Sequence, residues 1–138
     1  MLTPPKLDHI TIKGFRSLAN IDKLALNDVN VLIGANGSGK SNFVEAFSFL
    51  RALGEANLQR YVVQAGGANQ LLHFGAGRTT EMSFRVSMNK EVDQYGITLA
   101  ATDSDGLVPV AEATYFWSDK ERFPDLVSIL CLSAVSKP

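Results

Sequence analysis

The chain contains little cysteine, no long apolar run and almost no excess charge. Its single cysteine, Cys131, can form neither an intramolecular disulfide nor a cysteine-based metal cluster. No apolar run approaches the roughly 18 residues that a membrane-spanning helix needs. The opening MLTPPKLDHI lacks the charged-then-apolar layout of a signal peptide. From these absences we expect a cytoplasmic protein without a membrane segment.

The charge balance is also uninformative about partners. Thirteen lysines and arginines oppose 14 acidic residues, so the net charge is −1. Such a chain has no general attraction to nucleic acid or to anionic lipid. A DNA contact would need a local basic patch, and the longest candidate along the sequence, Lys13 to Arg16, holds two charges. Charge therefore neither proposes a partner nor excludes one.

The first third of the chain predicts three strands. LDHITIKGF, residues 7–15, partly alternates and reads as a strand that ends near Gly14. IDKLALND, residues 21–28, has a short alternating core and predicts an edge strand paired with the first. VNVLIG, residues 29–34, has four apolar residues in six and predicts a strand covered on both faces.

After these strands the apolar spacing becomes helical. Phe43, Phe47 and Leu50 recur at i, i+4 and i+7, which predicts one long amphipathic helix on the sheet. Gly54 can end or kink this helix, and the helical spacing continues through QRYVVQ, residues 59–64.

From about residue 80 the pattern becomes that of β-strands. Residues 81–88 and 95–102 each place apolar side chains on one face, and the DSDG sequence at 103–106 supplies a tight turn. EATYFW, residues 112–117, follows Pro109 and predicts a third, aromatic-rich strand. These strands predict an antiparallel β-meander with one buried face. The chain thus reads as an α/β protein with a mixed sheet, one long helix and a β-meander.

The most informative stretch is GANGSGKS, residues 34–41, which fits G-x-x-x-x-G-K-[ST] between a predicted strand and a predicted helix. Its glycines allow backbone N–H groups to point inward as an anion nest, and the positive end of the helix points to the same place. Lys40 can reach the β- and γ-phosphates, and the Ser41 hydroxyl suits Mg²⁺. The alternative is a glycine turn in which the lysine and serine are incidental.

The exact residues of this loop narrow the family. The sequence G-x-N-G-x-G-K-S-N, with Asn36 and Asn42, resembles ABC-type ATPases of the RecF, SMC and OLD kind. ITIKGFRSL before the loop and SNFVEAFSFL after it resemble the start of RecF-like ATPases, and GGANQLLHFG resembles them more loosely. ABC subunits of transporters share the loop, but in those proteins the hundred residues after the loop are less rich in antiparallel strand than in this sequence. The transporter subunits are therefore the less favoured resemblance.

This resemblance implies a P-loop NTPase fold, specifically the N-terminal lobe of an ABC-ATPase head. It covers the whole chain and is strongest over residues 8–53. We expect one incomplete domain, 1–138, with a nucleotide-binding α/β part at 1–80, a β-meander at 81–118 and a tail at 119–138.

The resemblance also implies roles for individual residues. The family's equivalent of Lys40 grips the terminal phosphates of ATP, and the equivalent of Ser41 ligates magnesium. Arg16, in the KGFRS stretch, is either a phosphate or base contact or a solvated turn arginine. The expected nucleotide-binding set is Gly34, Asn36, Gly37, Ser38, Gly39, Lys40, Ser41, Asn42 and Arg16.

Residues for hydrolysis are not evident in this sequence. Hydrolysis needs an acidic residue at the end of another strand and usually an adjacent glutamate, and the family adds an LSGG-like signature and a histidine. The chain has no LSGG-like string, so the catalytic residues are unknown. Asp103 is explained by the hairpin turn that it opens, and Glu112 by a position on the solvent face of a strand. His9 and His73 are interpreted as packed or solvated histidines. Gln64 or Gln70 could be a magnesium-sensing glutamine, which is suggested by spacing alone.

The sequence therefore predicts the ATP-binding N-terminal portion of a RecF/SMC-like ATPase that serves DNA repair, chromosome maintenance or phage defence. Its cofactors would be ATP and Mg²⁺, without efficient turnover by this chain alone. Its expected partners are a second copy or another oligomer through the head, and DNA or a nuclease in the full system. The alternatives are a non-catalytic nucleotide-binding or dimerisation module from a truncated gene and, least favoured, a small-metabolite kinase, which would need an arginine-rich lid.

Overall fold

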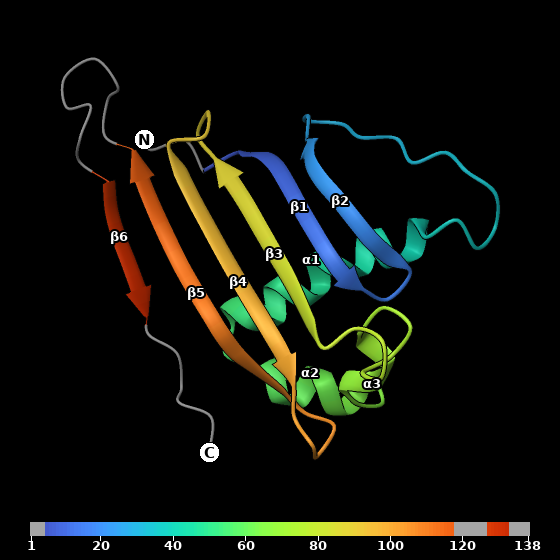
Figure 1. Cartoon of the computed structure of the whole chain (residues 1–138). Coiled ribbons are helices and arrows are strands. Elements are labelled where there is room, and N and C mark those ends of the chain that lie inside the picture. The colour runs from blue at the N-terminus through green and yellow to red at the C-terminus, as the bar shows by residue number, and fades with distance from the viewer. Residues whose placement is uncertain (1–4, 118–126, 133–138) are drawn as a thin grey trace.

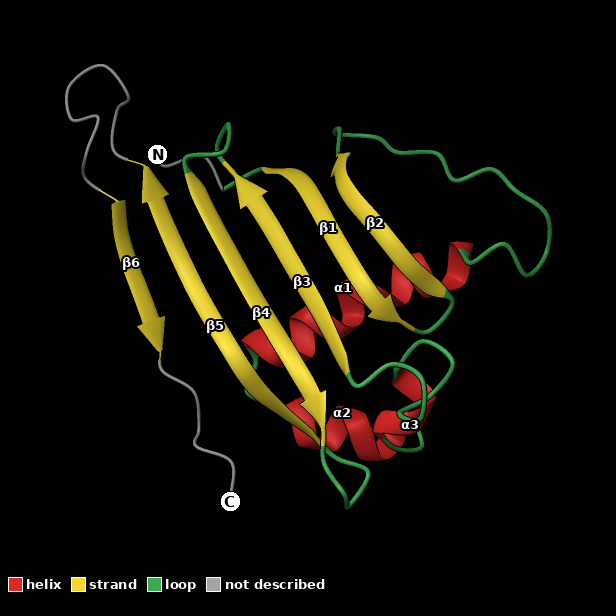
Figure 2. Cartoon of the chain, viewed as in Figure 1, coloured by secondary structure: helices red, strands yellow, loops and turns green. Residues whose placement is uncertain are grey.

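The computed structural model describes residues 5–117 and 127–132, and for 117 and 127–132 it describes the backbone. Within these residues one twisted six-stranded sheet has the order β2-β1-β3-β4-β5-β6. Three helices lie on one face of the sheet (Figures 1 and 2). The elements are β1 Leu7–Phe15, β2 Leu18–Ala25, α1 Lys40–Gly54, α2 Leu58–Gln64, α3 Ala68–Leu71, β3 Glu81–Met88, β4 Asp93–Ala101, β5 Leu107–Trp117 and β6 Val127–Leu132.

Every strand pairing in the described sheet is antiparallel, so the predicted mixed sheet is wrong. The predicted strand at 29–34 is also wrong, because this run lies in the extended connection between β2 and α1 (Figure 1). Val29, Val31 and Ile33 are 80%, 75% and 91% exposed. An apolar run forms an interior strand only beside partner strands, and both edges of β1 are already paired with β2 and β3.

The N-terminal hairpin is as predicted. β1 pairs with β2, which is the edge strand of the sheet and begins three residues earlier than the predicted residue 21. Arg16, in the turn, has a φ of 48° and donates its backbone N–H to the carbonyl oxygen of Leu71 at 2.7 Å. This hydrogen bond ties the hairpin turn to α3.

The single long helix that we expected is divided in two. α1 ends at Gly54 and α2 begins at Leu58, because Ala56 takes a left-handed φ of 56° that no α-helix can continue through. The buried stripe of α1 also differs slightly from the prediction. Its buried members are Phe43, Ala46, Phe49 and Ala52, while Phe47 and Leu50 are partly buried against the core.

The core lies between the sheet and the helices. Phe15 of β1, Phe49 of α1 and Phe84 of β3 form a triangle with ring centroids 5.1–5.5 Å apart. All three side chains are at most 2% exposed. Large aromatic rings bury the most apolar area per residue, so this triangle is the main attachment of α1 to the sheet.

The predicted β-meander is present as β3, β4 and β5. The pairing of β4 with β5 shifts register where Leu99 lies opposite Pro109, a residue that has no N–H to donate to a ladder. β6, from the predicted tail, pairs with β5, and residues 118–126 and 133–138 lie outside the described residues. The expected parts 1–80 and 81–118 share one sheet, since β1 pairs with β3. No helix in the described part is long and apolar enough to cross a membrane.

Candidate functional site

The 34–41 loop is an exposed turn that leads directly into α1. Gly37 and Gly39 have φ angles of 82° and 95°, in the left-handed region that favours glycine. At Gly39 a Cβ atom would also lie 2.9 Å from the Ser17 hydroxyl oxygen. The glycine pattern of the sequence thus corresponds to a real backbone requirement.

The first turn of α1 has no side-chain cap. Gly39 is the N-cap residue, it makes no side-chain hydrogen bond, and the turn contains no acidic residue. The first N–H groups of a helix have no partner within the helix, and the macrodipole gives this end a positive partial charge. The start of this 15-residue helix is therefore a favourable place for an anion.

Lys40 folds back over the loop. Its Nζ atom donates hydrogen bonds to the carbonyl oxygens of Gly34 and Ala35, the latter at 2.7 Å, and lies 3.3 Å from the Ser38 hydroxyl oxygen. These contacts hold a positive charge over the same turn that presents the helix N-terminus. Asn36 and Ser41 are exposed, so their polar groups are open to solvent.

Arg16 is a partly buried structural residue rather than a solvated turn arginine. Its Nη2 donates to Glu45 Oε1 at 2.6 Å, and the Tyr61 hydroxyl donates to the same oxygen at 3.0 Å. Burial raises the pKa of Tyr61 to about 12, and the hydrogen bond to Glu45 adds to the rise. The cluster joins the β1–β2 turn to α1 and α2, and the Nε atom of Arg16 is buried without a hydrogen-bond partner in the described structure.

A small hollow lies beside the first turn of α1. Arg16 and Asn42 line it together with Gln70 and Phe74, and its volume is about 380 Å³. The Asn42 amide nitrogen donates to the Ser17 hydroxyl oxygen at 2.7 Å, and this oxygen lies beside Gly39 of the 34–41 loop. Two predicted site residues therefore meet in this hollow. No pattern in the sequence indicated a role for Phe74, which is distant from both residues along the chain.

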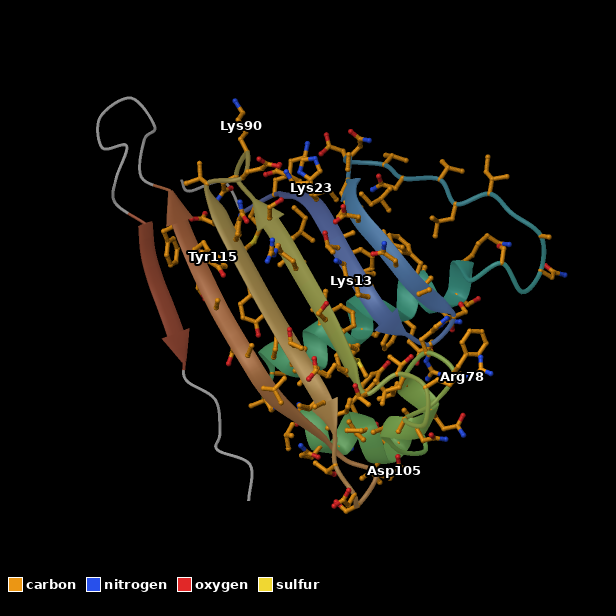
Figure 3. All side chains as sticks on the ribbon, viewed as in Figure 1. Lys13, Lys23, Arg78, Lys90, Asp105 and Tyr115 are labelled. Atoms are coloured by element: carbon orange, nitrogen blue, oxygen red, sulfur yellow. The ribbon has the colours of Figure 1, made fainter. Side chains whose placement is uncertain are left out.

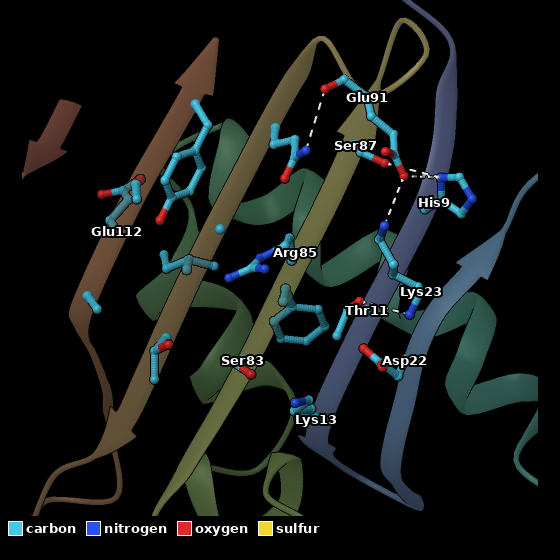
Figure 4. Close-up of a pocket in the computed structure, with 18 residues that line it drawn as sticks. His9, Thr11, Lys13, Asp22, Lys23, Ser83, Arg85, Ser87, Glu91 and Glu112 are labelled. Atoms are coloured by element: carbon cyan, nitrogen blue, oxygen red, sulfur yellow. Dashed lines mark hydrogen bonds and ion pairs between the residues drawn. The ribbon is translucent and has the colours of Figure 1, made fainter. Parts of the chain in front are cut away.

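A larger and less open hollow, of about 560 Å³, lies on the sheet face away from the helices, which we call the polar sheet face (Figure 4). Lys23 and His9 meet Glu91 at 3.1 and 3.4 Å. The side chains of Lys13 and Arg85 make no hydrogen bond or ion pair with other described residues. The lining also contains the acidic residues Asp22, Glu91 and Glu112, so the face carries mixed charge. Sequence reasoning missed this surface, because its cations come from β1, β2 and β3.

Three further residues considered for catalysis, Glu112, Asp103 and His73, make their contacts with residues outside the 34–41 loop. Glu112 accepts a hydrogen bond from the Tyr95 hydroxyl at 2.7 Å, and Asp103 lies in the β4–β5 turn as expected. The His73 Nδ1 atom lies 2.6 Å from the Arg16 carbonyl oxygen. The described residues contain no cluster of three or more His, Cys, Asp or Glu residues that could hold a metal ion.

Comparison with known sequences identifies the family. The family model of the RecF/RecN/SMC N terminal domain matches residues 6–106. Because the match covers more than half of the chain, the chain belongs to this family.

Three relatives illustrate the range of the family. The DNA replication and repair protein RecF of Pseudarthrobacter chlorophenolicus is 39% identical over 72 residues, which are 52% of this chain and 16% of RecF. Structural maintenance of chromosomes protein 3 of Saccharomyces cerevisiae is 39% identical over 74 residues, 51% of this chain and 6% of that protein. The DNA double-strand break repair Rad50 ATPase of Methanosarcina mazei is 31% identical over 120 residues, 80% of this chain and 11% of Rad50.

The chain thus spans a small fraction of the length of these relatives. No solved structure matches it significantly.

Proposed function

We propose that this chain is the ATP-binding N-terminal portion of a RecF/SMC-like ATPase. The observation that carries the proposal is the 34–41 loop, where left-handed Gly37 and Gly39 lead into an uncapped helix start with Lys40 folded over it. Membership of the RecF/RecN/SMC N-terminal family supports the same function.

The residues present fit a nucleotide with magnesium. The backbone N–H groups from Gly37 to Ser41 would bind phosphate oxygens, and Lys40 would exchange its loop carbonyl acceptors for the β- and γ-phosphates. The exposed Ser41 hydroxyl would take one position around Mg²⁺, which typically retains several waters and bonds to substrate phosphates. Magnesium neutralises phosphate charge when it is bound.

Binding without efficient turnover is the proposed activity of the chain by itself. Asp103 and Glu112 make no contact with the 34–41 loop, and neither is adjacent to a second acidic residue in the sequence. In phosphoryl transfer a positioned group must orient or activate the attacking water. A hydrolytic cycle would need further residues from the longer protein or from a partner.

Isothermal titration calorimetry with ATP and Mg²⁺ tests the binding proposal. We expect Lys40→Ala to weaken affinity at least tenfold, because it removes the loop's mobile positive charge. Lys90→Ala is the matched control, since Lys90 is an exposed lysine in the β3–β4 turn (Figure 3). Equal affinities for the wild-type protein and Lys40→Ala would contradict the proposal. Sustained phosphate release by the wild-type chain would contradict the claim of binding without turnover.

A DNA partner is a second proposal, and the polar sheet face supports it. Lys13 and Arg85 are free of ion pairs within the described residues, and Lys23, which is paired with Glu91, lies on the same face (Figure 4). The relatives are named for DNA repair and chromosome maintenance, and we propose a role of that kind or in phage defence. The alternative is a non-catalytic nucleotide-binding or dimerisation module.

Fluorescence anisotropy with a labelled duplex, at two salt concentrations, tests DNA binding. Arg85→Ala should lower the affinity for DNA. It should also reduce the slope of log affinity against log salt concentration by about one, because one phosphate contact is lost. Arg60→Ala, an exposed arginine on α2, is the control on the helix side. An equal effect of both variants would exclude the polar sheet face as the DNA site.

A further inference from the structure

Phe74, between α3 and β3, has an exposure and a backbone conformation that packing does not explain. Its side chain is 74% exposed, although phenylalanine is the largest purely apolar ring in the chain. Its φ is 57°, in the left-handed region that L side chains rarely adopt. Strained backbone of this kind persists only where the surrounding structure holds it, and it is common at binding sites.

The loop that carries Phe74 is held in place by hydrogen bonds on both sides. The backbone N–H of His73 donates to the Gly14 carbonyl oxygen at 2.9 Å. The Asn69 side-chain oxygen accepts the N–H of Ala76, also at 2.9 Å. The structure thus fixes the backbone on each side of Phe74 and presents its ring to solvent.

Phe74 also lies next to the proposed nucleotide site. It lines the same hollow as Asn42, which is two residues after Lys40 in the first turn of α1. Gln70 lies on the polar wall of that hollow. Side-chain amides can donate and accept hydrogen bonds at once, which matches the edge of a heterocyclic base.

The ring's existing neighbours leave it available. The Arg78 guanidinium carbon lies 5.8 Å from the ring centroid, near the outer limit of a cation–π contact (Figure 3). The His73 ring is tilted by 57° to it, with centroids 4.2 Å apart. Despite both contacts, most of the Phe74 side chain remains in water.

We propose that Phe74 is a stacking platform for the heterocyclic base of the nucleotide whose phosphates the 34–41 loop binds. The amides of Gln70 and Asn42 hydrogen bond to the edge of that base. This inference rests on the proposed function, because it needs the phosphates at the start of α1. The hollow beside α1 would then hold the base of the same nucleotide and not a second ligand.

The experiment compares two ligands on the full chain by isothermal titration: Mg²⁺ with ATP, and Mg²⁺ with inorganic triphosphate, which has no base. The variants are Phe74→Asn, which removes the ring but tolerates the left-handed conformation, and Phe74→Trp, which keeps an aromatic face. Phe116→Asn, a 50% exposed phenylalanine on β5, is the control.

We expect Phe74→Asn to weaken ATP binding roughly 5- to 150-fold, the range for loss of one base–aromatic stack, and to leave triphosphate binding unchanged. Phe74→Trp should retain ATP binding, and its fluorescence should change when ATP is added. Two outcomes would overturn the inference alone: unchanged ATP binding by Phe74→Asn, or equal weakening of both ligands. Failure of the wild-type protein to bind either ligand would overturn the proposed function together with this inference.

Discussion

The rings of Phe49 in α1 and Phe84 in β3 are stacked, with centroids 5.1 Å apart and planes inclined by 28°. This contact fixes the helix that follows the 34–41 loop against the centre of the sheet. The position of the proposed phosphate site therefore depends on an aromatic core contact about two helical turns from the loop.

Phe49→Ala should reduce the free energy of unfolding by roughly 3–5 kcal/mol, because it leaves a cavity where a fully buried ring was. Phe116→Ala should change it by less than about 0.5 kcal/mol, since that ring is half exposed. Urea denaturation followed by circular dichroism measures both values. Similar losses in the two variants would show that the Phe49–Phe84 stack does not anchor α1.

The glycines at the two ends of α1 should respond oppositely to substitution by alanine. Gly39→Ala should destabilise the fold by about 1–2 kcal/mol, because the new Cβ would occupy a left-handed backbone close to Ser17. Gly54→Ala meets open space at a helical position and should stabilise by about 0.5–1 kcal/mol. Thermal unfolding compares the two variants, and a stabilising Gly39→Ala would contradict the loop conformation described.

Stability should fall at alkaline pH. The folded pKa of Tyr61 is about 12 against an ordinary value of 10, because burial and the Glu45 hydrogen bond favour the neutral phenol. Its contribution is therefore complete below pH 10 and is lost as the pH rises through about 12. Burial and Glu112 raise the pKa of Tyr95 in the same direction.

Denaturation midpoints between pH 9 and pH 12 test this dependence. Tyr61→Phe should flatten the decline, and the double variant with Tyr95→Phe should flatten it further. A decline as steep in the double variant as in the wild-type protein would assign it to other groups.

The exposed apolar segment 29–33 should promote self-association. Ile33 is 91% exposed, so Ile33→Ser should change the unfolding free energy by less than about 0.5 kcal/mol. Sedimentation velocity should nevertheless show fewer oligomers, because contiguous apolar surface drives association. Val63→Ser, at a 77% exposed position on α2, is the control. Equal oligomer content in the wild-type protein and Ile33→Ser would show that this segment does not drive self-association.

The sequence predicted elements whose signal is local. Alternation in residues 81–88 identified β3 because one face of an antiparallel strand is buried and the other is not. The 34–41 loop was predictable because its glycines have a local backbone role. The run at 29–34 misled us, since β-branched apolar residues form a strand only where partners exist.

Residues brought together by the fold were not predictable. Arg85 joins Lys13 on the polar sheet face through strand pairing, and Phe74 joins Asn42 through the loop after α3. Arg16 was expected either at the nucleotide or in solvent, and its contact with Glu45 is 29 residues away in the chain. A single sequence carries no periodic signal for such contacts.

The most direct test of the central claim is a ¹⁵N-resolved NMR titration with Mg²⁺ and ATP. We expect the largest amide shifts at Gly37, Gly39, Lys40 and Ser41, because their N–H groups would bind the phosphates. In Lys40→Ala these shifts should require at least tenfold more ATP. Shifts confined to the polar sheet face, or none at the start of α1, would contradict the account.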